Sequence, residues 1–210
     1  MPDKHFSLLI TGMSGSGKTA TALSLVNELC ADGIPTTYIS FDRLRKELVP
    51  AGVDAFSADR AVKEMIYRRA IDSFNELTSR TNAVIDSGIS VEKNRRWIRD
   101  ETGTKIIHVH APLPVCVVRE TRRSLREKGD RARFLYLRAY ASLLMPRRYP
   151  QPGVTYPFEY PSCADLHVDS FRYNPEERAH RIRYWMHENN MAPVRYFSIA
   201  GTETRLKVPA

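Results

Sequence analysis

The chain has 210 residues, 42% hydrophobic and 27% charged, an ordinary composition for a globular protein with one buried core. No apolar run approaches the roughly 20 residues that span a bilayer, and the start leads directly into a strand-like segment without a signal peptide, so we expect a cytoplasmic protein with no membrane contact. Three widely spaced cysteines argue against a disulfide framework, and the net charge of +8, mostly from arginine, suits anionic partners, either small molecules or nucleic acid.

The first predicted unit is a strand, a glycine-rich loop and a helix. The apolar segment 6–11 predicts a buried strand, and 20–29 predicts a helix. The loop between them fits the pattern G-x-x-x-x-G-K-[ST], in which backbone N–H groups and the helix dipole bind phosphate. Lys18 would reach the β- and γ-phosphates, and Thr19 would bind Mg²⁺. We therefore predict an ATP or GTP site formed by Gly12, Ser14, Gly15, Ser16, Gly17, Lys18 and Thr19.

Further apolar runs alternate with helix-like stretches, which predicts an α/β fold. We expect a three-layer, P-loop NTPase-type domain over 1–210, with helices on both faces of a central parallel sheet of about five strands. The remaining predicted strands are 36–41, 83–86, 105–110 and 165–168. Two helices are predicted over about 58–77 and 94–101. Two more are predicted to start near Pro114 and after Asn174.

Two carboxylates follow predicted strands, Asp42 after the second and Asp86 at the end of the third. The carboxyl ends of parallel strands form the ligand crevice of such a sheet, so both would lie beside the glycine-rich loop. Asp42 is then a candidate to act on an acceptor hydroxyl or on Mg²⁺, and Asp86 a candidate to support Mg²⁺. The structural alternatives are a helix N-cap for Asp42 and a turn for Asp86.

Residues 119–149 are rich in arginine and look less regular. We interpret them as a lid and basic insertion, in which Arg119, as the hinge contact, and Arg123 would close over the nucleotide. A solvated helix face is the alternative interpretation. The proline-rich stretch 146–163 predicts an extended loop, and 190–210 a C-terminal extension with a possible edge strand near 193–199.

Several motifs in the expected order resemble the adenylyl-sulfate kinase family over about residues 5–185. They are the loop at 12–19, Asp42 and Arg45 within Phe-Asp-Arg-Leu-Arg, Phe-Ser-Ala-Asp-Arg at 56–60, Ile-Ser at 89–90, the strand and turn at 109–116, and 153–159. The resemblance implies ATP and Mg²⁺ as cofactors and the 3′-hydroxyl of adenylyl sulfate as the default acceptor. It implies that Asp42 and Lys18 are catalytic and that the acceptor is held by Arg45, Phe56, Arg60, Ser90 and Phe158. Relatives in this family often dimerise, so a homodimer is a further expectation.

The departures from the family pattern fall mostly on the acceptor side. Lys63, Met65 and Ile66 stand where the family has an Asn and an Arg pair, Thr155 replaces an Asp, and Glu92 falls in a Pro-Tyr-Arg segment. About ten extra residues lie before Gly153. The acceptor is therefore adenylyl sulfate in a modified pocket or another small anionic or polyhydroxylated metabolite. A kinase acting on RNA, DNA ends or tRNA is a less favoured alternative, and a non-catalytic nucleotide switch is disfavoured because Lys18 and Asp42 are both present.

Overall fold

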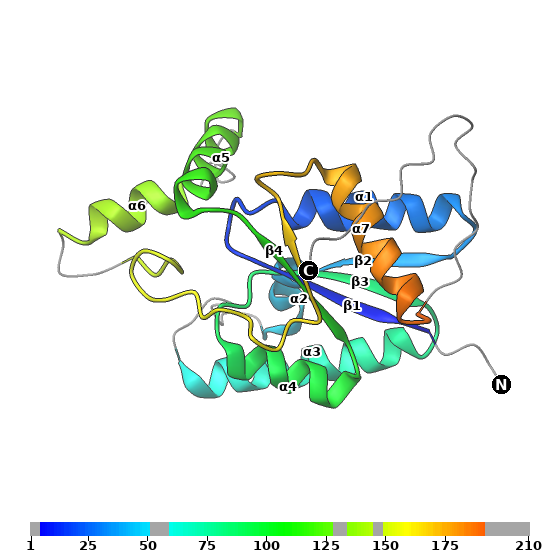
Figure 1. Ribbon diagram of the computed structural model, residues 1–210. Coiled ribbons are helices and arrows are strands. Elements are labelled where there is room, and N and C mark those ends of the chain that lie inside the picture. The colour runs from blue at the N-terminus through cyan, green and yellow to red at the C-terminus, as the bar shows by residue number, and fades with distance from the viewer. Residues whose placement is uncertain (1–4, 51–58, 128–133, 145–148, 192–210) are drawn as a thin grey trace.

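The computed structural model describes residues 5–50, 59–127, 134–144 and 149–191. Its centre is a five-stranded parallel sheet in the order β2-β3-β1-β4-β5 (Figure 1). The strands are β1 (Ser7–Thr11), β2 (Thr36–Ser40), β3 (Asn82–Ser87), β4 (Lys105–His110) and β5 (Leu166–Asp169). All the predicted strands are confirmed, because short, mainly apolar runs buried on both faces, such as β1 and β3, are typical of a parallel sheet.

Seven helices complete the described part of the chain: α1 (Lys18–Ala31), α2 (Phe41–Leu48), α3 (Arg60–Thr78), α4 (Glu92–Thr102), α5 (Leu113–Arg126), α6 (Leu135–Ser142) and α7 (Pro175–Glu188). Figure 1 shows α1 and α7 on one face of the sheet and α3 and α4 on the other, with α5 and α6 beyond the carboxyl ends of the strands. The helices on both faces confirm the predicted three-layer architecture.

Two apolar clusters fix the layers. One joins the sheet to α1 and α7 through Leu8, Leu25 and Ile182, and the other joins it to α3 and α4 through Leu9, Phe74 and Ile98. Leu8 and Leu9 are adjacent in β1 and point to opposite faces, as strand geometry requires. In the described residues, no helix is long and apolar enough to cross a membrane.

Three details differ from the sequence prediction. Phe41, expected in the second strand, begins α2, and its buried ring packs beside Tyr67 and Phe74 of α3. The arginine-rich stretch is more regular than expected, because α5 continues to Arg126 and α6 lies within the insertion. Residues 149–163 form an irregular loop as predicted, whereas the proposed edge strand near 193–199 lies outside the described residues.

Candidate active site

The loop between β1 and α1 has the geometry that its glycines predict. Gly15 and Gly17 have φ of 78° and 91°, a left-handed conformation that side chains rarely adopt. A Cβ atom at Gly15 would collide with the carbonyl oxygen of Cys116, and one at Gly17 would collide with the guanidinium of Arg178. The loop therefore needs glycine at both positions for backbone conformation and for close packing.

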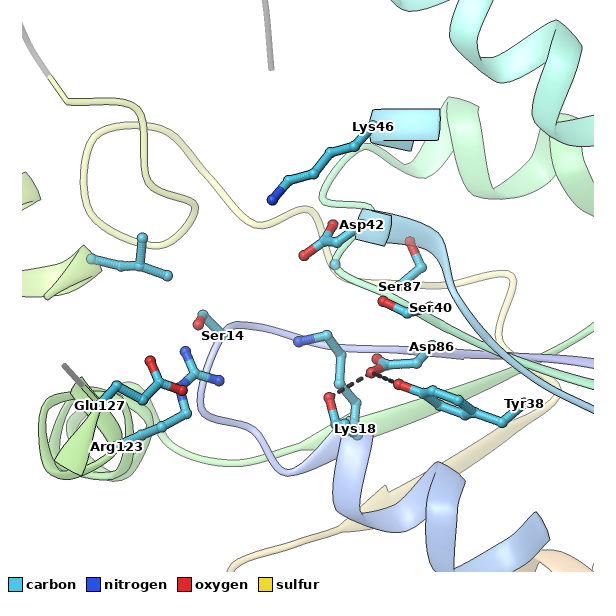
Figure 2. A pocket seen from close by; sticks show the side chains of 13 residues that line it. Ser14, Lys18, Tyr38, Ser40, Asp42, Lys46, Asp86, Ser87, Arg123 and Glu127 are labelled. Atoms are coloured by element: carbon cyan, nitrogen blue, oxygen red, sulfur yellow. Dashed lines mark hydrogen bonds between the residues drawn. The ribbon is translucent and has the colours of Figure 1, made fainter. Parts of the chain in front are cut away.

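A cavity of about 450 Å³ opens beside this loop at the carboxyl ends of the strands (Figure 2). The sheet brings the predicted residues Lys18, Thr19, Asp42 and Asp86 together here, although they come from three different elements, α1, α2 and β3. The other lining residues are Ser14, Tyr38, Ser40, Lys46, Ser87, Gly88, Arg123, Glu127 and Leu135. The cavity is therefore polar, with cationic and anionic side chains facing the same space.

Asp86 is the best-connected carboxylate of the cavity. The Thr19 hydroxyl donates a hydrogen bond to its Oδ2 at 2.5 Å, and the Tyr38 hydroxyl donates to the same oxygen at 3.2 Å. The second oxygen, Oδ1, is buried without a hydrogen-bond partner in the described structure. A buried carboxylate oxygen is costly to leave unpaired, so this pair of Thr19 and Asp86 fits a hard divalent cation such as Mg²⁺.

Tyr38 sets the orientation of this carboxylate. Burial, together with the neighbouring Asp86 charge, raises the pKa of the Tyr38 phenol to about 12. The phenol therefore stays protonated at neutral pH and remains a hydrogen-bond donor to Asp86. A donor fixed in this way holds the carboxylate against rotation.

Asp42 and Lys46 lie one turn apart on α2, and Figure 2 shows both side chains extending toward the cavity. Asp42 is exposed in the first turn of α2, whose N-cap position is held by Ser40. The N-cap alternative for Asp42 is therefore wrong. The Asp42 carboxylate is accessible from solvent and lies across the cavity from Lys18. This position suits a general base that accepts the proton of an acceptor hydroxyl.

Arg119, predicted as the hinge contact of a lid, is hydrogen-bonded to the residue that follows β5. Its guanidinium donates two hydrogen bonds to Ser170, to Oγ at 2.9 Å and to the backbone oxygen at 2.8 Å. The Ser170 hydroxyl in turn donates to the backbone oxygen of Ser16 at 2.5 Å. Arg119 thus braces the glycine-rich loop through the end of β5, and its predicted contact with a nucleotide stays a prediction.

Arg123 lies one turn further along α5 and lines the cavity, as the lid interpretation expects. Whether this helix closes over a ligand stays a prediction. The arginines at 131, 133, 147 and 148 lie outside the described residues.

The predicted acceptor residues are not all gathered in this cavity. The Arg45 guanidinium lies 6.0 Å from the centre of the Phe41 ring, Ser90 accepts a backbone hydrogen bond from Glu159, and neither lines the cavity. Phe158 lies instead in a second cavity of about 290 Å³, where its ring stacks on His108. Phe56 and the side chain of Arg60 lie outside what the structure describes, so all five assignments stay predictions.

Two departures from the family pattern have structural roles here. Glu92 Oε1 accepts hydrogen bonds from the Ser162 hydroxyl at 2.8 Å and from the Cys163 backbone N–H at 2.9 Å. Thr155 Oγ1 accepts a bond from the Gln151 backbone N–H at 2.7 Å. Both side chains therefore stabilise the irregular loop on the acceptor side.

Sequence reasoning missed Tyr38, Lys46 and Tyr136. Lys46 could have been found from its i+4 spacing to Asp42 once a helix was assigned there. Tyr38 resembles an ordinary strand residue, and Tyr136 lies in an insertion whose composition predicts no helix. Buried Tyr136 donates a hydrogen bond to the backbone oxygen of Ser14 at 2.8 Å, which ties α6 to the glycine-rich loop.

Comparison with known proteins agrees with this geometry. The family model described as adenylylsulphate kinase matches residues 4–169. A probable adenylyl-sulfate kinase of Pseudomonas aeruginosa is 31% identical over 182 residues, covering 84% of this chain and 75% of that protein.

Two solved structures share the fold. The Mycobacterium tuberculosis APS kinase CysC in complex with AMPPNP and APS has a TM-score of 0.67 at 22% identity, covering 89% of this chain and 99% of that one. Shikimate kinase from Acinetobacter baumannii in complex with shikimate has a TM-score of 0.54 at 16% identity, covering 90% and 97%. At these identities the likeness concerns the fold alone.

Proposed function

Because the chain belongs to the adenylylsulphate kinase family and is an ATP-dependent kinase of that type, we propose that it transfers the γ-phosphate of ATP to a hydroxyl of a small anionic acceptor. The default acceptor is the 3′-hydroxyl of adenylyl sulfate. The observation that carries this proposal is the convergence of Lys18, Thr19, Asp86 and Asp42 on one cavity. These residues supply a phosphate-binding cation, a metal site and a carboxylate for the hydroxyl.

In the proposed reaction, the acceptor oxygen forms a bond to the γ-phosphorus while the bond from that phosphorus to the bridging oxygen of ADP breaks. Asp42 orients the acceptor hydroxyl and takes its proton on a carboxylate oxygen. Lys18 and Arg123 stabilise the charge of the transferring group. Thr19 and Asp86 would hold Mg²⁺, which would supply positive charge to the phosphate groups of the nucleotide.

Three cations and three carboxylates line the cavity, and the cations give an anionic acceptor partners in addition to the phosphate-binding Lys18. Lys46 and Arg123 line it in addition to Lys18, and each adds a cation near the bound substrates. A second candidate is a different small metabolite, because Glu92 and Thr155 replace family residues with others that serve the loop. Unpaired buried polar groups cost about 1–3 kcal/mol each, so several such changes could exclude adenylyl sulfate.

A radiolabelled ATP transfer screen tests the acceptor. Purified protein with Mg²⁺ is offered adenylyl sulfate, nucleosides, sugars, shikimate-like hydroxy acids and RNA, and Asp42→Asn protein provides the background. Labelled product from adenylyl sulfate supports the default, and product from another small acceptor replaces it. If only RNA is labelled and the binding falls steeply with salt, the small-molecule proposal is wrong.

A further inference from the structure

Arg178, in the first turn of α7, is a buried arginine beside the glycine-rich loop. It is 3% exposed, and its Nε donates to the backbone oxygen of Asn174 at 3.1 Å. Its Nη1 lies over Gly17, where it would collide with any added Cβ, and has no hydrogen-bond partner among the described residues. A buried guanidinium nitrogen left without an acceptor is costly, which indicates that a ligand supplies one.

The charges around Arg178 are unfavourable on balance, because the repulsion from Arg119 outweighs the attraction to the exposed carboxylate of Glu176. Burial, followed by the nearby positive charge of Arg119, lowers the pKa of Arg178 to about 10. The guanidinium also lies at the start of α1 and of its own helix α7, and helix N-termini favour anions over cations. Of the two carboxylates in the first turn of α7, Glu177 is used by the capping box on Asn174 and Glu176 is exposed.

The position of Arg178 identifies which part of a nucleotide would lie there. Lys18, Thr19 and Asp86 face the cavity that contains Asp42, so the β- and γ-phosphates belong on that side. Arg178 is not among the residues that line this cavity and lies against Gly17, where α1 begins. In loops of this type the backbone N–H groups hold the α- and β-phosphates, so the α-phosphate is the anion farthest from the transferred group.

We propose that Arg178 binds the α-phosphate of ATP through Nη1. This inference rests on the proposed function, since it concerns the same nucleotide. Arg119 cannot take this role in the same way, because both of its Nη atoms already donate to Ser170. Arg178 therefore supplies the one buried guanidinium donor beside the loop that the described structure leaves unused.

Adenosine 5′-O-(1-thiotriphosphate) provides a direct test, because sulfur replaces one or the other α-oxygen in its two diastereomers. A hydrogen bond to one particular α-oxygen makes the protein bind the diastereomers unequally. Binding of each is measured by calorimetry in Mg²⁺ and again in EDTA, which removes any preference of the metal for sulfur. Arg178→Met and Arg178→Lys are compared with wild type.

We expect wild type to prefer one diastereomer severalfold in both buffers. Arg178→Met should bind ATP about 10- to 100-fold more weakly, since hydrogen bonds to charged groups are strong, and should lose the preference. Arg178→Lys should keep part of the affinity because it keeps the charge. Arg183→Met is the matched control: Arg183 also joins α7 to α1, through Glu28 and Asp32, so its loss should lower stability and leave the preference intact.

The outcomes separate this inference from the proposed function. Equal binding of the two diastereomers by wild type, or an unchanged preference in Arg178→Met, would overturn the role of Arg178 while leaving ATP binding established. If Arg178 only stabilised the fold, Arg178→Met would lower the melting temperature and weaken the binding of both diastereomers equally. Failure of wild type to bind ATP at all would contradict the proposed function itself.

Discussion

The Tyr136 hydroxyl donates a hydrogen bond to the backbone oxygen of Ser14, joining the inserted helix α6 to the middle of the glycine-rich loop. Tyr136 is fully buried, and burial raises the pKa of its phenol, so the group remains a donor at any physiological pH. The insertion is therefore tied to the glycine-rich loop and is not a separate surface addition.

Tyr136→Phe removes this donor and keeps the ring. We expect a loss of about 1 kcal/mol in unfolding free energy and a severalfold weaker affinity for ATP, because the Ser14 oxygen is left without its partner. Urea unfolding and calorimetry measure the two effects. Tyr140→Phe, on the exposed side of α6, is the control and should change neither. Equal ATP affinity in wild type and Tyr136→Phe would contradict the link between insertion and loop.

Lys18→Ala should abolish ATP turnover. Lys18 is the cation that the loop presents to the cavity, and charge stabilisation by such groups contributes a factor of about 10²–10³ or more to the rate. Circular dichroism should show an unchanged fold, since the Lys18 side chain lies in the cavity and not in the core. Turnover at the wild-type rate would refute the assignment of the loop.

Asp42→Asn separates binding from transfer. The amide is nearly the same size but cannot take a proton, so we expect ATP affinity to remain within twofold while acceptor phosphorylation falls by about 10²–10⁴. Single-turnover transfer of labelled phosphate measures the chemical step. A variant with full activity would show that another group receives the proton.

Tyr38→Phe tests the positioning of Asp86. Losing the donor to Oδ2 frees the carboxylate to rotate, so the Mg²⁺ concentration needed for half-maximal ATP binding should rise severalfold. ATP affinity in EDTA should stay unchanged, because Tyr38 acts on the metal site alone. An equal loss of affinity in both buffers would indicate instead a direct contact between Tyr38 and the nucleotide.

The nucleotide half of the site was predictable because its signals are local. The strand, the loop and the start of α1 are contiguous in the sequence, and Asp42 and Asp86 follow strands whose ends must meet at one edge of a parallel sheet. The same argument could identify Tyr38, but a tyrosine in a strand is equally typical of the protein core.

Other parts had no local signal. Arg178 meets Gly17 across most of the chain, and its neighbours Ala179 and Ile182 mark α7 simply as a core helix. The helix α6 was hidden because its flanks are rich in arginine and proline, which favour a loop interpretation. The side chain that anchors α6, Tyr136, acquires its role only through tertiary packing.

Glu92→Gln tests the acceptor-side loop and has a defined pH dependence. Burial opposes ionisation of Glu92, but hydrogen bonds from Ser162, Arg95 and Cys163 outweigh it and lower the pKa of the carboxyl to about 2. The charged form is therefore favoured in the folded state. Its contribution to stability is fully present above the unfolded pKa, near 4.5, and is lost as the pH falls toward 2.

At pH 7, Glu92→Gln should lower the free energy of unfolding by about 1–3 kcal/mol, because the amide cannot pair with the buried guanidinium of Arg95 and still accept both loop hydrogen bonds. Urea unfolding of both proteins at pH 7, 5, 4 and 3 should show this difference constant down to about pH 5 and smaller below it. Glu76→Gln is the control: Glu76, on α3, forms an exposed ion pair with Arg80 just beyond the helix, so its loss should cost little at any pH. A difference between wild type and Glu92→Gln that stays the same from pH 7 to pH 3 would show that the Glu92 charge does not hold the loop.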